Sequence, residues 1–229
     1  TRAKLFYDMT KKSMGAITLY DFVTMDEIQT ITFSDSAEIQ AALKSYLEFG
    51  YTTIANVKLV SQAGLIIMGN ISLSKDKKPI RLKYFSELPE TFKESALLDR
   101  FHGFIEGWKL PRISEDLKIN GWTLNVEYFS EIMHELRDKP IYSAIVNDLL
   151  EVPAKADTRD TTAVKRIATA YLKLLFPNVN DTSDIDKEDF NNYCLIPAIE
   201  KRQIIRRQIN LIDEEFSDEM PDIKINESV

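Results

Sequence analysis

The sequence contains little cysteine and histidine, and this limits the kinds of site that it can build. Among its 229 residues there is one cysteine, Cys194, and there are two histidines, His102 and His134. A single cysteine cannot form an internal disulfide, so a reducing, cytoplasmic compartment is expected. These three side chains follow no spacing typical of zinc ligands, so no zinc site is expected either.

Long apolar runs and an excess of basic residues are also missing. No apolar run reaches the roughly 20 residues that a membrane-spanning helix needs, and no signal peptide is present, so no membrane partner is expected. The formal net charge of −7 argues against a generally basic surface, although a local basic groove is compatible with it. The sequence begins at Thr1 without an initiating Met, which suggests a fragment of a longer protein.

A phosphate-binding loop of the pattern Gly-x-x-x-x-Gly-Lys-[Ser/Thr] does not occur in the sequence. Without its backbone N–H groups and its lysine, the β- and γ-phosphates of a nucleotide lose their main anchor. We therefore expect this chain alone to bind ATP weakly and to hydrolyse it negligibly. No Ser–Lys arrangement typical of a peptidase is present either.

The order of the predicted elements indicates an α/β half-domain followed by helices. Residues 17–25 form an apolar block that predicts a buried strand, and residues 51–60 and 65–68 predict further strands. Between them a helix is expected over residues 37–49, with capping candidates at 34–36 and a stop at Gly50. Residues 89–100 resemble a short helix.

From about residue 122 the apolar residues repeat at helical spacing. Helices are predicted over 126–136 and 141–150, from a cap at Asp160 to just before Pro177, and over 187–215 with an interruption near Pro197. We expect three parts, which are the C-terminal part of an α/β core (1–115), an α-helical lid (116–216) and an acidic, disordered tail (217–229).

Two acidic residues follow the first predicted strand. Residues 22–27, Phe-Val-Thr-Met-Asp-Glu, have the form of a Walker B strand, in which a buried strand delivers two carboxylates to the carboxyl edge of a sheet. Asp26 would hold Mg²⁺, and Glu27 would polarise the attacking water. Apolar strands often end in acidic loop residues without any such role, so this motif alone is weak evidence.

Asn70 and Arg100 are two further candidates. Asn70 follows the strand at 65–68, where its amide could orient the attacking water or contact the γ-phosphate as sensor 1; a simple turn after Gly69 is the alternative. Arg100 ends a short helix and could reach a neighbour's γ-phosphate, whereas a surface ion pair is its alternative. Their joint order along the chain, which is that of an AAA+ core after its first strand, is stronger evidence than any single motif.

Several segments carry a family resemblance, namely 21–27, 68–71, 163–166, 172–177 and above all Asp-Arg-Phe-His-Gly-Phe-Ile-Glu-Gly-Trp at 99–108. With these segments the chain resembles, over about residues 4–216, the Lon-related ATPase family of the BREX phage-resistance system, BrxL. The resemblance implies a partial AAA+ P-loop NTPase core similar to that of the MCM helicases, with ATP and Mg²⁺ as cofactors. It also implies DNA and further copies of the chain, in a hexameric ring or stacked rings, as partners in anti-phage defence, with other BREX components possible. The family's C-terminal Lon-like domain is missing here.

The resemblance also implies roles for individual residues. Asp26 would be the Mg²⁺ carboxylate, Glu27 the catalytic carboxylate, Asn70 sensor 1 and Arg100 a trans-acting arginine finger. The arginine of sensor 2 in the lid falls on Lys165, with Arg166 next to it. Both stay candidates, and two solvated cations on a lid helix are the alternative.

Two groups of basic residues are candidate DNA contacts. The first group lies in the loop after the strand at 65–68 and consists of Lys75, Lys77, Lys78, Arg81 and Lys83. The second lies on the late helix and consists of Lys201, Arg202, Arg206 and Arg207. A solvated charged face explains both groups equally simply and is favoured for the late helix. Residues 51–60 could form a pore-facing hairpin.

The sequence is compatible with three functions. The first is a subunit of an ATP-driven DNA-binding motor that is active only as part of a longer chain. The second is the AAA+ module of a Lon-like protease or a protein-remodelling ATPase, which would share the same ATPase motifs. The third is a degenerate, non-enzymatic assembly module.

Overall fold

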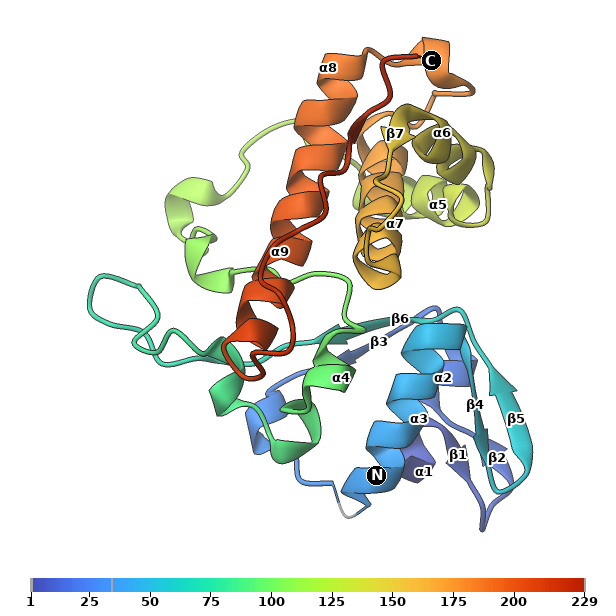
Figure 1. Ribbon diagram of the computed structural model, residues 1–229, viewed down its shortest axis with the longest axis vertical. Coiled ribbons are helices and arrows are strands. Elements are labelled where there is room, and N and C mark those ends of the chain that lie inside the picture. The colour runs from blue at the N-terminus through green and yellow to red at the C-terminus, as the bar shows by residue number, and fades with distance from the viewer. Residues whose placement is uncertain (1, 34, 229) are drawn as a thin grey trace. The chain divides into compact units, whose positions relative to one another are not determined.

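The computed structural model describes residues 2–33 and 35–228, which divide into two compact units. Unit 1 comprises residues 1–101 and 208–217, and unit 2 comprises residues 102–207 and 218–229 (Figure 1). The predicted capping residue Ser34 lies outside the described residues. The division falls after Phe101 rather than at 115, because the backbone N–H of Phe104 already donates to the carbonyl of Lys201 within unit 2, at 3.2 Å.

Unit 1 mixes short helices with small sheets. Its helices are α1 (Arg2–Leu5), α2 (Ala16–Leu19), α3 (Ser36–Phe49) and α4 (Ser95–Leu98), with 3₁₀ turns at Ile28–Thr30, Tyr84–Glu87 and Glu90–Phe92. Its strands are β1 (Tyr7–Asp8), β2 (Ser13–Met14), β3 (Phe22–Met25), β4 (Tyr51–Ile54), β5 (Val57–Val60) and β6 (Gly64–Ile67). The β1–β2 and β4–β5 pairs are antiparallel, whereas β3 and β6 are parallel.

The parallel pair organises unit 1. β3 and β6 lie side by side in Figure 1, in a register that runs from Phe22 opposite Gly64 to Met25 opposite Ile67. Parallel neighbours need a crossover connection. Here it consists of α3 and the β4–β5 hairpin. The fold is therefore mixed α/β, and its parallel sheet has two strands within the described part of the chain.

Helix α3 supplies much of the core of unit 1. Ile39 and Leu43, one turn apart on the same face, are fully buried. They join a buried cluster that also contains Phe6, Ile17, Ile28, Phe92 and Leu97. As predicted, the helix ends at Gly50, which adopts the left-handed conformation with φ of 71°.

The single long strand predicted over 17–25 is wrong. Residues Ala16–Leu19 form helix α2, in which Ile17 is buried, and only Phe22–Met25 form a strand. A short apolar run is compatible with a buried helix or a buried strand, and its composition alone does not separate them.

Unit 2 is mainly helical. Its helices are α5 (Val126–Arg137), α6 (Ile141–Leu149), α7 (Thr158–Leu175), α8 (Lys187–Phe190) and α9 (Ile196–Asn210), the last of which has its final residues in unit 1. Short 3₁₀ turns lie at Gly107–Lys109, Glu115–Leu117 and Thr182–Asp184, and a π-helical segment spans Asn191–Leu195. A small antiparallel pair joins β7 (Leu150–Glu151) to β8 (Lys224–Ile225).

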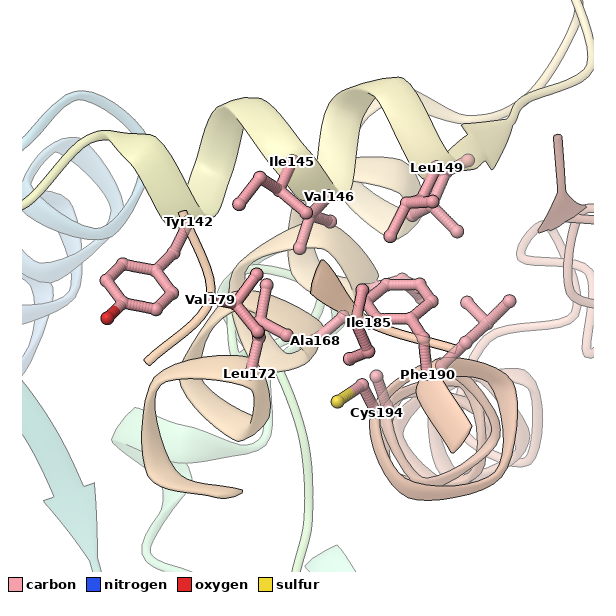
Figure 2. Close-up of a cluster of buried hydrophobic side chains, with 14 of the residues drawn as sticks. Tyr142, Ile145, Val146, Leu149, Ala168, Leu172, Val179, Ile185, Phe190 and Cys194 are labelled. Carbon is pink, nitrogen blue, oxygen red and sulfur yellow. The ribbon is translucent and has the colours of Figure 1, made fainter. Parts of the chain in front are cut away.

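Side chains from α6, α7 and the segment that contains Phe190 and Cys194 point toward one another in the core of unit 2 (Figure 2). Val146, Leu172 and Phe190 are fully buried there. Burial raises the pKa of the Cys194 thiol to about 12, so it stays protonated and packs as a small apolar side chain. The helical periodicity of the sequence predicted these helices because their apolar stripes face this core.

The predicted interruption near Pro197 takes the form of the π-helical segment just before it. Proline has no N–H to donate to a carbonyl of the preceding turn, so regular α-helical bonding is broken there.

Two further predictions about unit 2 are wrong. The cap of α7 is Asp157, whose side chain accepts hydrogen bonds from the backbone of Arg159 and Asp160, whereas Asp160 itself is fully buried. The tail predicted to be disordered contributes strand β8, and Ile223 just before it is buried in the core. Met220 and Ile225 of the same segment are partly buried against this core, and the burial of apolar area stabilises the ordered tail.

No helix in the described part of the chain is long and apolar enough to cross a membrane.

Candidate functional site

The segments that follow β3 and β6 are tied together by backbone hydrogen bonds. The N–H of Met68 donates to the carbonyl of Met25 at 2.8 Å, and the N–H of Ile28 donates to the carbonyl of Met68 at 3.0 Å. The N–H of Asn70 then donates to the Gln29 side chain at 3.3 Å. Asp26 and Glu27 come from the first segment and Asn70 comes from the second, so all three belong to one edge of the sheet.

Glu27 has an unusual backbone conformation. Its φ of 47° and ψ of 45° lie in the left-handed region, which costs a residue with a side chain roughly 1–2 kcal/mol. Two hydrogen bonds hold this turn. The Glu27 N–H donates to Oδ1 of Asp26 at 2.8 Å, and the N–H of Thr30 donates to the Glu27 carbonyl at 2.8 Å. Strained backbone of this kind persists where the surrounding structure holds it, and it is frequent at functional sites.

Gly69 allows the two segments to approach closely. A Cβ atom at this position would lie 2.9 Å from Cγ2 of Ile28 and 3.1 Å from Oε1 of Gln29. Ile28 is fully buried and has little room to move. The glycine before Asn70 is therefore required by packing against the turn that follows Glu27.

The side chains at this edge suit a hard cation. Asp26, Glu27 and Asn70 are all exposed to solvent, and each offers oxygen atoms of the kind that Mg²⁺ prefers. In the described part of the chain no group of three or more His, Cys, Asp or Glu residues gathers into a complete metal cage. An edge with one or two carboxylates fits the usual mode of Mg²⁺ binding, in which waters and substrate phosphates complete the coordination.

Arg100 is engaged within its own unit and does not project into solvent. Its Nε lies 2.9 Å from Oε2 of Glu48, and its side chain is 17% exposed. Its Nη1 also donates to the backbone carbonyl of Ala96. Arg100 therefore forms an ion pair, as in the alternative interpretation of its sequence position, with Glu48 on α3 as the counter-ion.

Lys165 and Arg166 lie next to each other on α7 in unit 2. Lys165 is half-buried, while Arg166 is exposed and donates from Nη1 to Nε2 of His102 at 2.9 Å. Burial, together with the charges of Arg166 and Arg202, lowers the pKa of His102 to about 4. At the level of sequence His102 is an unlikely zinc ligand, and its contact with Arg166 was not predicted. Its place in the distinctive segment at 99–108 was the available signal.

The basic loop after β6 is a small hairpin. An isolated bridge joins Leu73 and Pro79, and the N–H of Ser74 donates to the carbonyl of Lys78 at 2.8 Å. Its basic side chains are all exposed, and they are Lys75, Lys77, Lys78, Arg81 and Lys83. The structure thus presents these cations to solvent on an ordered loop.

The second basic group does not form a surface patch. Arg202 is fully buried, and its Nε lies 2.6 Å from Oδ1 of Asp160. Arg206 is also buried, with its Nη1 at 3.3 Å from the other oxygen of Asp160. Lys201 is half-buried with its Nζ over the Tyr171 ring, which leaves only Arg207 of this group exposed. Neither interpretation of these four residues holds, because the buried ion pairs of Arg202 and Arg206 fit neither a DNA-binding patch nor the favoured solvated charged face.

Comparison with known proteins identifies the family. The family described as "Lon-like protease BrxL-like, ATPase domain" matches residues 1–222. The chain belongs to this family. It is 29% identical over 209 residues to the Lon-like protease BrxL of Escherichia coli O9:H4 (strain HS), and the match covers 91% of this chain. It is also 29% identical over 197 residues to the Lon-like protease BrxL of Bacillus cereus (strain H3081.97), with 86% of this chain covered.

In both cases the match spans 29% of the length of the BrxL relative. The chain therefore corresponds to one part of these longer proteins, and that part lies within the BrxL ATPase domain.

Proposed function

We propose that this chain is the part of an AAA+ ATPase that carries the Mg²⁺-binding and catalytic carboxylates, and that in its full-length form it acts as a ring-forming DNA-binding motor in a BREX-type anti-phage system. The observation that supports this most is the parallel pairing of β3 with β6. This pairing brings Asp26, Glu27 and Asn70 to the carboxyl edge of one sheet, where open α/β folds bind their ligands.

The chemistry of the proposed site follows from these side chains. Bound Mg²⁺ would neutralise charge on the β- and γ-phosphates of ATP. Asp26 would hold the ion through a carboxylate oxygen. Glu27, the next residue, would accept a proton from a water molecule and orient it for attack, and the Asn70 amide would hydrogen-bond to that water or to the γ-phosphate.

The phosphates themselves need an anchor from elsewhere in the longer protein. This sequence contains no phosphate-binding loop, and the chain spans 29% of the length of its BrxL relatives. We therefore assign weak ATP binding and negligible hydrolysis to the isolated chain.

Arg100 would act on the nucleotide of a neighbouring subunit. A guanidinium that stabilises the transferring phosphoryl group must reach it directly, so in this proposal Arg100 leaves Glu48 when a neighbour's γ-phosphate is present. The Glu48 carboxylate and the neighbour's γ-phosphate would thus compete for the Arg100 guanidinium.

The DNA contact is assigned to the basic hairpin after β6. Exposed lysines and arginines bind phosphates and release counter-ions, which makes the affinity depend on salt. In the longer protein, replacing Lys75, Lys77 and Lys78 by Gln is expected to weaken DNA binding and to reduce the salt slope of log K by up to about 3. Replacement of Lys4, Lys11 and Lys12, which lie outside the hairpin, is the matched control. An unchanged salt slope in the hairpin variant would remove this assignment.

The catalytic assignment is tested by Glu27→Gln in the longer protein. This change keeps the size of the side chain but removes the carboxylate, so binding of a fluorescent ATP analogue is expected to persist while steady-state hydrolysis falls by about 10²-fold or more. Glu38→Gln on α3, outside the proposed site, is the control. Normal hydrolysis by the Glu27 variant would remove Glu27 from the catalytic role.

Proteolysis is the second candidate, because the BrxL relatives carry the printed name "Lon-like protease". The ATPase residues would be the same in both cases. ATP-dependent cleavage of a casein substrate by the longer protein, lost on mutation of a Ser–Lys pair outside this chain, would favour the protease. ATP-dependent assembly on DNA without such cleavage would favour the motor.

A further inference from the structure

We propose that His102 is a positioning residue that holds Arg166 as a phosphate-binding cation by giving its guanidinium a neutral hydrogen-bond acceptor. The proposal deepens the function proposed above and rests on it, because the phosphate is taken to be that of the bound nucleotide. It also selects Arg166 rather than its neighbour Lys165 as the cation of the helical unit.

The direction of the hydrogen bond follows from chemistry. Arginine has no acceptor atom, so Nη1 of Arg166 must donate and Nε2 of His102 must accept, at 2.9 Å. The imidazole can accept at Nε2 only in its neutral form, with its proton on Nδ1. The lowered pKa of His102 keeps the ring in this form at neutral pH.

The contact with His102 distinguishes Arg166 from three other arginines of the chain. Arg100 faces Glu48, and both Arg202 and Arg206 face Asp160, so each of these charges has a nearby counter-charge. Among the residues that the structure describes, Arg166 has no carboxylate at ion-pair distance. The hydrogen bond to His102 orients the Arg166 guanidinium but does not neutralise its charge. A fixed, uncompensated guanidinium on an exposed helix position suits a phosphate, which accepts two parallel hydrogen bonds from it.

Contacts of the next two residues, Gly103 and Phe104, fix the backbone position of His102. Gly103 lies against two helices, since a Cβ atom there would meet Cβ of Lys201 at 3.0 Å and Cδ1 of Ile167 at 3.1 Å. The N–H of Phe104 donates to the carbonyl of Lys201 at 3.2 Å. His102 is therefore held beside α7 by contacts with α7 and α9. His102 directly precedes this glycine, and Arg166 directly precedes Ile167 on α7, so the close approach at Gly103 lies next to the contact between the imidazole and the guanidinium.

The decisive comparison is His102→Gln against His102→Glu in the longer protein. Both side chains have the same size and can accept a hydrogen bond from Arg166, but only Glu neutralises the guanidinium. We expect His102→Gln to keep ATP affinity within about threefold of wild type and His102→Glu to weaken it about tenfold or more, as Arg166→Ala does. The probe is a fluorescent ATP analogue with Mg²⁺, and thermal melting of each variant checks that it is folded.

Non-additivity provides the second readout. Because Glu at position 102 would act through Arg166, the double variant His102→Glu, Arg166→Ala is expected to bind ATP no more weakly than Arg166→Ala alone. Lys155→Ala, which removes an exposed cation in the turn just before the same helix, is the matched control and is expected to bind ATP normally.

The outcomes separate this proposal from the one on which it rests. Equal ATP affinity in the Gln and Glu variants, or additive losses in the double variant, would overturn the positioning role of His102. Normal affinity in Arg166→Ala would remove Arg166 from the nucleotide site, whereas the carboxylate edge is judged separately by the Glu27→Gln measurement.

Discussion

The backbone N–H of Ile28 donates to the carbonyl of Met68 at 3.0 Å, and this bond joins the turn that carries the two acids to the turn that carries Asn70. The bond lies beyond the last paired residues of β3 and β6. It therefore extends the parallel pairing into the loops, where the candidate side chains are. The geometry of the proposed site depends on this junction more than on any single side chain.

Gly69→Ala is expected to loosen the junction. The new methyl group would meet the buried Ile28 side chain, and overpacking of this kind costs about 1–3 kcal/mol. Urea unfolding of this chain measures the change. Gly107→Ala is the matched control, because no atom lies within 4 Å of a Cβ there, and it is expected to change stability by less than about 0.5 kcal/mol. Equal stability in the two variants would show that Gly69 is not closely packed.

Glycine at position 27 is expected to be more stable than alanine. The left-handed backbone of Glu27 disfavours a side chain, so Glu27→Gly should exceed Glu27→Ala in stability by about 1 kcal/mol. At an ordinary helical position the order is reversed. Thermal melting of the two variants decides the order, and a more stable alanine variant would contradict the strained turn.

Asp160→Ala is expected to destabilise unit 2 by about 3–5 kcal/mol, because it removes the carboxylate that faces the buried Arg202 and Arg206 charges. Asp157→Ala, which removes the cap of the same helix, should cost only about 1 kcal/mol. Chemical denaturation of both variants compares the two losses. Similar small losses would mean that the Arg202 guanidinium reaches water.

The stability of the chain should fall below neutral pH in part through His102. Its pKa is about 4 in the folded chain and about 6.5 when unfolded, so between these values the unfolded chain binds a proton that the folded chain does not. The contribution is complete above pH 6.5 and is lost as the pH falls toward 4, to a total of about 1–3 kcal/mol. His102→Gln removes this titration. Wild type should therefore lose more stability than the variant between pH 7 and pH 4.5, and parallel pH profiles would contradict this.

Arg100→Ala in the longer protein is expected to lose ATP hydrolysis and to regain part of it in mixed assemblies with Glu27→Gln subunits. Each variant supplies the group that the other lacks, provided that the site lies between subunits. Glu48→Gln, which weakens the hold on Arg100, is expected to leave hydrolysis intact or raise it. Full hydrolysis by a monomeric wild-type protein would rule out the trans-acting role.

The elements that the sequence predicts correctly are those with a local residue pattern. The helices at 36–49, 126–137 and 141–149 follow from apolar spacing, and the end of the first follows from Gly50. The placement of two acids and an amide at one sheet edge follows from the rule for carboxyl ends of parallel strands. The helices need no knowledge of distant contacts, whereas the shared sheet edge depends on the pairing of β3 with β6.

What the sequence did not predict depends on contacts between distant residues. Asp160 looks like a helix cap until Arg202, 42 residues away, is seen to pair with it. His102 lies 64 residues from Arg166, and neither residue type points to the other. The pairing of β8 with β7 likewise depends on a neighbour that no local pattern reveals.

A structure of the longer protein with Mg²⁺ and a non-hydrolysable ATP analogue tests the central claim most directly. We expect the ion to lie beside the Asp26 carboxylate, with the γ-phosphate within reach of Glu27 and Asn70. A nucleotide bound away from the carboxyl ends of β3 and β6 would contradict it.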